Sequence, residues 1–173
     1  MPPTLTGLAV AFAVFFIGFR LAELLRPPAR RLPLLRPGLA TDLAYWLFTP
    51  FVTKTVTRVA VIAVLVPFSL LVYGKVDKDM ILHGFGPLAR LPLWAQAIGI
   101  LVLGDFIGYW THRAFHRGRL WRFHAVHHSS TELDWLSSVR VHPVNDALTR
   151  IAGTLPVLAL GFAPVAVASA VPV

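Results

Sequence analysis

Histidine is concentrated in one short segment of this chain. Five of its seven histidines fall within the segment THRAFHRGRLWRFHAVHHSS, at His112, His116, His124, His127 and His128. The neutral imidazole is the commonest metal ligand among protein side chains. On a helix, residues three or four positions apart lie on the same side, so each of the two clusters presents its imidazoles together. This spacing predicts two groups of metal ligands that face a shared site.

An acidic residue and a tyrosine extend the first cluster along the same helix face. Asp105, Tyr109, His112 and His116 follow one another at spacings of four, three and four residues. A carboxylate within an apolar span is energetically costly and is by default a functional hypothesis. We therefore predict that Asp105 and Tyr109 are catalytic, with Asp105 orienting a ligand histidine or binding the metal itself. A hydrogen bond that only packs helices together is the alternative role for Asp105.

The available ligand types narrow the choice of metal. The chain contains no cysteine, so disulfides and thiolate metal sites are excluded. Nitrogen and carboxylate ligands suit iron, zinc, copper or nickel. A structural zinc ion usually takes four ligands, so the surplus of histidines favours two metal ions. The H-E-x-x-H order of zinc proteases is absent, which disfavours a zinc-dependent membrane hydrolase without excluding it.

The composition is that of a membrane protein. Hydrophobic residues make up 56% of the 173 positions and charged residues only 14%, with a mean hydropathy of +0.68. A soluble domain normally carries about 25% charged residues. The net charge of +8 comes from basic residues that flank apolar stretches rather than forming one soluble face. We therefore expect lipid, and not nucleic acid, as the partner.

Four apolar stretches are the candidates for membrane spans. They cover about residues 5–25, 56–72, 93–111 and 147–170. We interpret Asp42–Thr53 as a separate helix that dips into the membrane or lies on it, with Thr41 or Asp42 as its N-cap. The predicted fold class is all-α: an integral membrane helical protein with about four transmembrane helices. A single domain, residues 1–173, carries a histidine-rich helical cap at residues 105–146.

Basic residues are distributed unevenly between the loops. The region after the first stretch holds five: Arg20, Arg26, Arg30, Arg31 and Arg36. The histidine region holds six: Arg113, Arg117, Arg119, Arg122, Arg140 and Arg150. Only three lie between the second and third stretches: Lys75, Lys78 and Arg90. Cytoplasmic loops carry the excess of basic residues. We therefore expect a multi-pass protein with a cytoplasmic histidine face and an external N-terminus. The first stretch lacks a basic start and an obvious cleavage site, which favours a retained helix over a signal peptide.

The histidine motifs resemble those of the sterol desaturase/fatty acid hydroxylase superfamily of membrane di-iron enzymes. An H-x-x-x-H motif is followed by an H-x-x-H-H motif, directly after an apolar span. The neighbouring residues are also similar to the family pattern: Asp105, Tyr109-Trp110-x-His112-Arg113, Leu120-Trp121-x-Phe123-His124 and Arg140-x-His142-Pro143. The resemblance extends from about Asp42 to the end of the chain.

This resemblance implies a site and a reaction. The implied metal ligands are His112, His116, His124, His127, His128 and His142, and the implied cofactor is a pair of non-haem iron ions, with zinc as a possible substitute. The implied reaction uses O2 to hydroxylate or desaturate a membrane lipid of the sterol or fatty acyl type. Electrons are expected from a separate donor, cytochrome b5-like or of the ferredoxin/reductase type, because the chain has no dinucleotide fingerprint, cysteine or haem motif.

The chain departs from the family pattern in one respect. Such proteins carry a further H-x-x-H-H motif, but no histidine follows His142. We therefore expect an incomplete domain, truncated before the last histidine motif. A non-catalytic or inactive metal-binding membrane protein remains an alternative.

Overall fold

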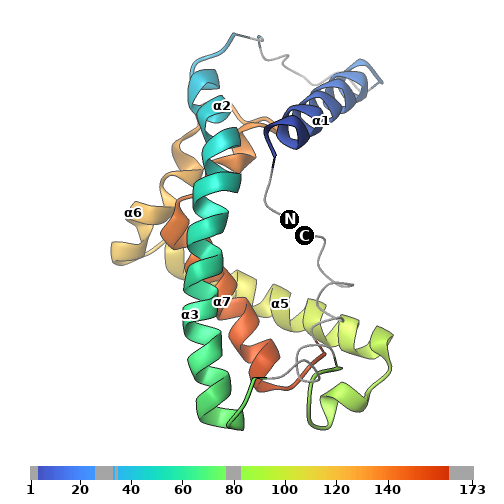
Figure 1. Ribbon diagram of the computed structural model, residues 1–173. Coiled ribbons are helices and arrows are strands. Elements are labelled where there is room, and N and C mark those ends of the chain that lie inside the picture. The colour runs from blue at the N-terminus through green and yellow to red at the C-terminus, as the bar shows by residue number, and fades with distance from the viewer. Residues whose placement is uncertain (1–3, 26–32, 34, 77–82, 164–173) are drawn as a thin grey trace.

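Helices are the only regular elements in the described part of the chain (Figure 1). The computed structural model describes residues 4–25, 33, 35–76 and 83–163. The helices are α1 (Leu5–Leu25), α2 (Leu39–Phe48), α3 (Lys54–Tyr73), α5 (Leu93–Phe115), α6 (Trp121–His124) and α7 (Pro143–Ala159). Short turns of other helix types are η1 (Thr49–Thr53), η2 (Leu88–Arg90), η3 (Gly118–Leu120), η4 (His127–Ser129) and η5 (Ser137–Val139). The predicted all-α fold class is confirmed.

Three helical segments of the described residues are long and apolar enough to cross a membrane. They are Leu5–Leu25, Leu39–Tyr73 and Leu93–Phe115. The predicted fourth span, about residues 147–170, is described only as far as residue 163, and its helix α7 ends at Ala159. The rest of that predicted span lies outside the described residues.

The second segment is one continuous rod rather than two helices. The prediction of a separate helix at Asp42–Thr53 was wrong, because α2, η1 and α3 follow one another without a break. Pro50 lies at the start of the π-helical turn η1, which accommodates its missing N–H donor without ending the helix. The predicted cap was also wrong: Gly38, with a φ of +85°, precedes the first helical residue, and no side chain caps it.

Asp42 is instead the centre of a buried ionic cluster. Its side chain is fully buried and lies between two guanidinium groups, those of Arg36 (2.7 Å) and Arg140. Arg36 also pairs with Asp134 at 2.7 Å, and Arg140 donates to the Ser129 hydroxyl at 3.2 Å. The cluster therefore joins the start of α2 to the loop that follows the histidines.

Polar contacts also attach the start of α7 to the long rod. The Thr57 hydroxyl donates to the Asp146 carboxylate at 2.8 Å, and the Lys54 ammonium approaches the same carboxylate at 3.3 Å. The buried Thr53 donates to the carbonyl of Val141 at 3.3 Å. Because α7 also packs against α5, these contacts place three helices around one end of the histidine region.

Aromatic rings connect α1 to the same region. The Trp135 ring, in the loop between η4 and η5, stacks on Phe19 at a centroid distance of 5.7 Å. Phe12 of α1 lies 5.5 Å from Trp135 and 5.6 Å from Trp46 of α2. Edge-to-face and stacked aromatic pairs of this kind add to the energy of simple apolar burial. The loop after the histidines is thus held by rings on one side and by ion pairs on the other.

The buried ion cluster yields a stability prediction. Asp42→Asn is expected to lower the free energy of unfolding by about 3–5 kcal/mol, because it leaves two buried guanidinium groups without their shared counter-charge. Glu23→Gln is the matched control, since the Arg20–Glu23 pair has side chains 36% and 40% exposed. The control should cost less than about 1 kcal/mol. Denaturant unfolding in detergent micelles measures both, and equal losses would contradict the assignment.

Candidate metal centre

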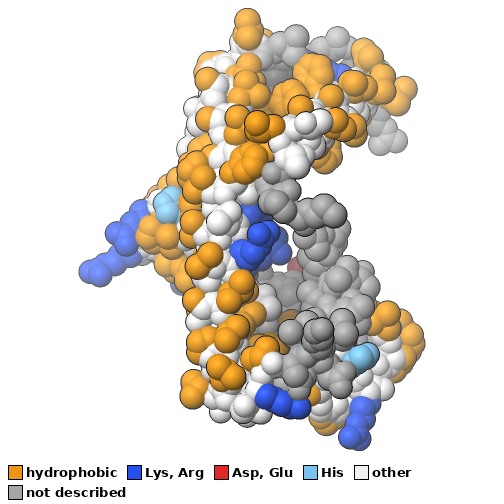
Figure 2. Space-filling view, in the orientation of Figure 1, with side chains coloured by type: hydrophobic (Ala, Val, Ile, Leu, Met, Phe, Trp, Pro, Cys, Tyr) orange, Lys and Arg blue, Asp and Glu red, His pale blue; other side chains and the backbone are white. Residues whose placement is uncertain are grey.

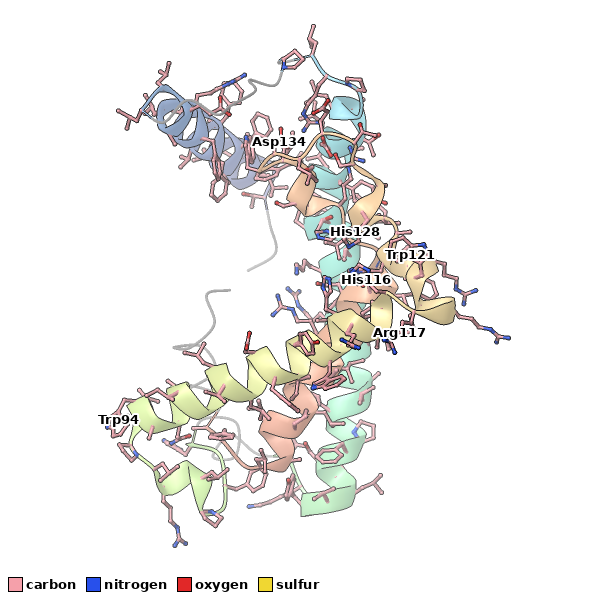
Figure 3. The ribbon with its side chains drawn as sticks, turned by 180° about the vertical axis from the view of Figure 1, so that it is seen from behind. Trp94, His116, Arg117, Trp121, His128 and Asp134 are labelled. Atoms are coloured by element: carbon pink, nitrogen blue, oxygen red, sulfur yellow. The ribbon has the colours of Figure 1, made fainter. Side chains whose placement is uncertain are left out.

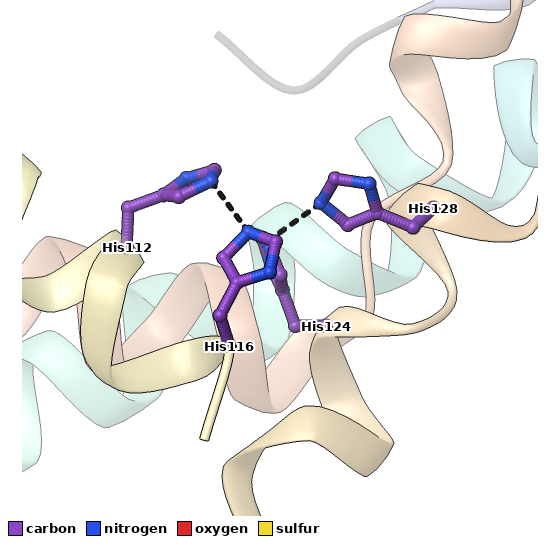
Figure 4. A group of neighbouring side chains, drawn as sticks. All are labelled: His112, His116, His124 and His128. Atoms are coloured by element: carbon purple, nitrogen blue, oxygen red, sulfur yellow. Dashed lines mark hydrogen bonds between the residues drawn. The ribbon is translucent and has the colours of Figure 1, made fainter.

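Four histidines converge on one point in the structure. His112 and His116 lie at the end of α5, His124 lies on α6 and His128 on η4 (Figures 3 and 4). One ring nitrogen from each lies within 4.8 Å of the other three. The Nε2 atoms of His112 and His116 are 2.9 Å apart, and those of His124 and His128 are 3.1 Å apart. The predicted meeting of the two clusters is present for these four residues.

The chain reversal after α5 brings the second cluster back to the first. Helix α5 ends at Phe115, and Gly118 adopts a φ of +56°, a conformation that glycine reaches without steric cost. The short helix α6 then returns toward the last turn of α5. The end of α5 contributes His112 and His116, while α6 and η4 together contribute His124 and His128.

A hydrogen bond to Asn145 favours the tautomer of His124 that leaves Nε2 free to bind a metal. It is 3% exposed, and its Nδ1 lies 3.0 Å from Oδ1 of Asn145 on α7. An amide oxygen only accepts hydrogen bonds, so Nδ1 carries the proton and Nε2 keeps a free lone pair toward the other histidines. Burial lowers the pKa of His124; the bond to Asn145 opposes this shift, and neighbouring imidazoles add to it. His124 is therefore neutral at neutral pH, as a ligand must be.

Aromatic rings form the walls around the four imidazoles. The Phe115 ring stacks on His124 at a centroid distance of 5.6 Å. The Trp121 ring lies 5.5 Å from His116 and 5.7 Å from His128. His112, His116 and His128 are exposed, so the group is closed on the His124 side and open on the other. An open group of four imidazoles fits a transition-metal ion that keeps positions for other ligands.

Two predicted ligands lie outside this group. The Nδ1 of His127 faces the backbone carbonyl of Arg140 at 3.4 Å. His142 caps α7, because its Nδ1 accepts the N–H of Val144 at 3.1 Å. These contacts use one nitrogen of each ring. The role of His127 and His142 as metal ligands stays a prediction.

Asp105 and Tyr109 lie beside the centre, on the face that the spacing predicted. With Gly108, His112 and Arg113 they line an open hollow of about 420 Å³. The Tyr109 hydroxyl accepts a hydrogen bond from Arg113 at 3.0 Å. Asp105 is exposed and, within the described residues, makes no hydrogen bond or ion pair. The proposed bond from Asp105 to a ligand histidine is therefore not present, and the catalytic roles of both residues stay predictions.

Two residues that serve the site were not predicted as such. Asn145 orients His124, and Arg140 offers its carbonyl to His127 while its guanidinium pairs with Asp42. Asn145 comes two residues after the Arg140-x-His142-Pro143 motif, which was the one available signal. Its contact with a histidine 21 residues away depends on the placement of α7.

Comparisons with known proteins agree with the motifs. Residues 97–172 match the family model described as fatty acid hydroxylase. The chain is 36% identical over 110 residues to a protein named very-long-chain aldehyde decarbonylase GL1-8, from Oryza sativa subspecies indica and japonica; the alignment covers 61% of this chain and 35% of the relative. It is 41% identical over 72 residues to the ornithine lipid hydroxylase OlsE of Rhizobium tropici, covering 40% of this chain and 22% of the relative.

The chain thus spans about a third or less of the length of these curated relatives. No solved structure matches it. The family match contains all four converging histidines together with Asn145. Residues 97–172 are therefore similar to the fatty acid hydroxylase family, in agreement with the resemblance of the histidine motifs.

Proposed function

We propose that this chain is part of a membrane-bound oxidoreductase that uses O2 and two iron ions to hydroxylate or desaturate a lipid. The observation that carries the proposal is the convergence of four imidazoles at the end of an apolar helix. The family match and the lipid hydroxylase and aldehyde decarbonylase relatives support a lipid-modifying oxygenase.

The protein's own residues have distinct tasks in this proposal. His112, His116, His124 and His128 hold iron, which when bound supplies the reactivity toward O2 that a C–H oxidation needs. His127 and His142 are the candidate ligands of the second ion. Asn145 keeps the Nδ1 proton on His124, the Phe115 ring covers the buried side of the group, and the Trp121 ring lies beside His116 and His128.

The hollow beside His112 is the proposed place of the substrate. It opens on the face of α5 that carries Asp105, Gly108 and Tyr109, so a lipid can approach it from the bilayer. Tyr109, fixed by Arg113, and the unpaired Asp105 are the polar groups that orient the lipid. We place the histidine face on the cytoplasmic side and the N-terminus outside, which gives a separate soluble electron donor access to the centre.

Metal binding tests the four-histidine group directly. His112→Ala and His124→Ala should each weaken iron binding strongly. The loss of affinity should exceed the roughly 10–100-fold loss that is typical when only a hydrogen-bonding partner of a ligand is removed. His83→Ala is the matched control, because His83 lies ten residues before the start of α5 and is not one of the converging histidines. Elemental analysis of the purified chain, reconstituted with Fe(II) without oxygen, measures the content. Equal iron in all three variants would contradict the site.

Asn145 should affect metal affinity without touching the metal. Asn145→Leu removes the acceptor that holds the His124 tautomer and should weaken iron binding about 10–100-fold. Asn145→Asp keeps an oxygen acceptor and should retain the affinity within a few-fold. A competition titration with a coloured chelator measures both. Identical affinities of the leucine variant and the unmodified chain would show that Asn145 only packs against the ring.

Lipid oxidation tests the reaction itself. Membranes that contain the chain, supplied with 18O2 and a reducing system, should accumulate lipids that carry one 18O atom or lack two hydrogens, detected by mass spectrometry. The double variant His112→Ala/His124→Ala should form neither product. Stoichiometric zinc with hydrolytic products would support the hydrolase alternative instead. Sub-stoichiometric metal and unchanged lipids would support the non-catalytic alternative.

A further inference from the structure

A short basic projection leads from α5 to the metal centre. It consists of Arg117, η3 and the start of α6, and its three cationic residues, Arg117, Arg119 and Arg122, are here called the arginine arm. Lys and Arg side chains gather at the tip of the projection that carries α6 (Figures 1 and 2). No acidic residue occurs anywhere between Asp105 and Glu132. The arm therefore carries positive charge that its own sequence does not neutralise.

The arginines of the arm are available to a ligand. All three are exposed, and none of them forms an ion pair with another described residue. Arg122 lies over the ring of Phe123 at 4.6 Å, which leaves its guanidinium edge open to an acceptor. Exposed guanidinium groups without partners bind phosphate well, because their planar N–H groups match its oxygens. The arm is thus a surface for anions.

Its position favours a membrane as the source of those anions. The arm begins two residues after the end of α5, one of the helices long and apolar enough to cross a bilayer. Two exposed tryptophans, Trp110 and Trp121, lie just before the arm and within it. Tryptophan is enriched at the level of lipid headgroups, where its ring is partly apolar and its N–H is hydrated. If the arm bound an acidic soluble protein instead, these exposed indoles would not be needed. They therefore favour the membrane as the source of the anions.

The arm is also in contact with the metal centre. Trp121, between Arg119 and Arg122, packs beside His116 and His128 (Figure 3). Whatever holds the arm in place therefore also limits the movement of one wall of the four-histidine group.

We propose that the arginine arm binds the phosphate groups of anionic phospholipids in the bilayer that contains α5. This binding fixes the histidine region against the membrane surface, so that the hollow beside His112 faces the lipid. The proposal requires α5 to lie in the membrane but does not depend on catalysis or on the identity of the metal. Its failure is therefore distinguishable from a failure of the proposed reaction.

Lipid retention by the purified chain tests the arm. The detergent-solubilised chain is titrated with phosphatidylglycerol or phosphatidylcholine, and native mass spectrometry counts the bound lipids. The double variant Arg117→Gln/Arg119→Gln should lose affinity for phosphatidylglycerol by about fivefold per arginine, hence about 25-fold. The double variant Arg90→Gln/Arg150→Gln changes the net charge equally at exposed positions outside the arm and should lose less than about twofold.

Two further measurements, one at high ionic strength and one with a polyglutamate peptide, distinguish binding to membrane lipid from binding to an acidic protein. The preference for phosphatidylglycerol should shrink at high ionic strength, because the contacts are exposed and screened. Equal retention of the two lipids, or equal losses in the two double variants, would overturn the proposal. Binding of a polyglutamate peptide that depends on the arm, without a preference for phosphatidylglycerol, would also overturn it and indicate an acidic protein. An unchanged circular-dichroism spectrum and an unchanged unfolding midpoint of the arm variant verify that it is folded.

Discussion

The burial of one carboxylate constrains how the rest of this structure is arranged. Asp42 has no contact with water, so its charge is tolerable only while Arg36 and Arg140 both remain beside it. Arg140 in turn offers its carbonyl to His127 and stands two residues before His142, which caps α7. A single ionic cluster therefore sets the course of the chain between the second histidine motif and the last described helix.

The metal centre is assembled from elements that this constraint holds in register. The end of α5 supplies one histidine pair, α6 and η4 supply the other, and α7 supplies Asn145. Thr57 and Lys54 of α3 contact Asp146 in the first turn of α7, and Thr53 of η1 donates to the carbonyl of Val141 just before it. These contacts fix the start of α7, so the amide oxygen of Asn145 reaches the ring of His124. Burial of that ring favours the neutral form, which is the form that binds metal. The packing of α7, the tautomer of His124 and the neutral form of its ring thus all favour metal binding.

The centre lies between two surfaces of opposite character. On the α5 side is the open hollow with Asp105 and Tyr109, which we propose to receive the lipid. On the α6 side is the arginine arm, which we propose to bind headgroup phosphates. Trp121 lies within the arm and contacts two of the histidines, so the proposed attachment to the membrane would restrain one side of the centre.

The sequence by itself determined what depends on local periodicity: the helical fold, the pairing of His112 with His116, and the face shared by Asp105, Tyr109 and His112. Helical spacing encodes these relations within one or two turns, so no tertiary information is needed. Only the tertiary structure decided that His127 faces the carbonyl of Arg140, that Asn145 holds His124, and that Asp42 forms ion pairs instead of a cap. Each of these outcomes depends on contacts between separate elements, such as the 98 residues between Asp42 and Arg140, and a buried polar group takes whichever partner the packed helices bring to it.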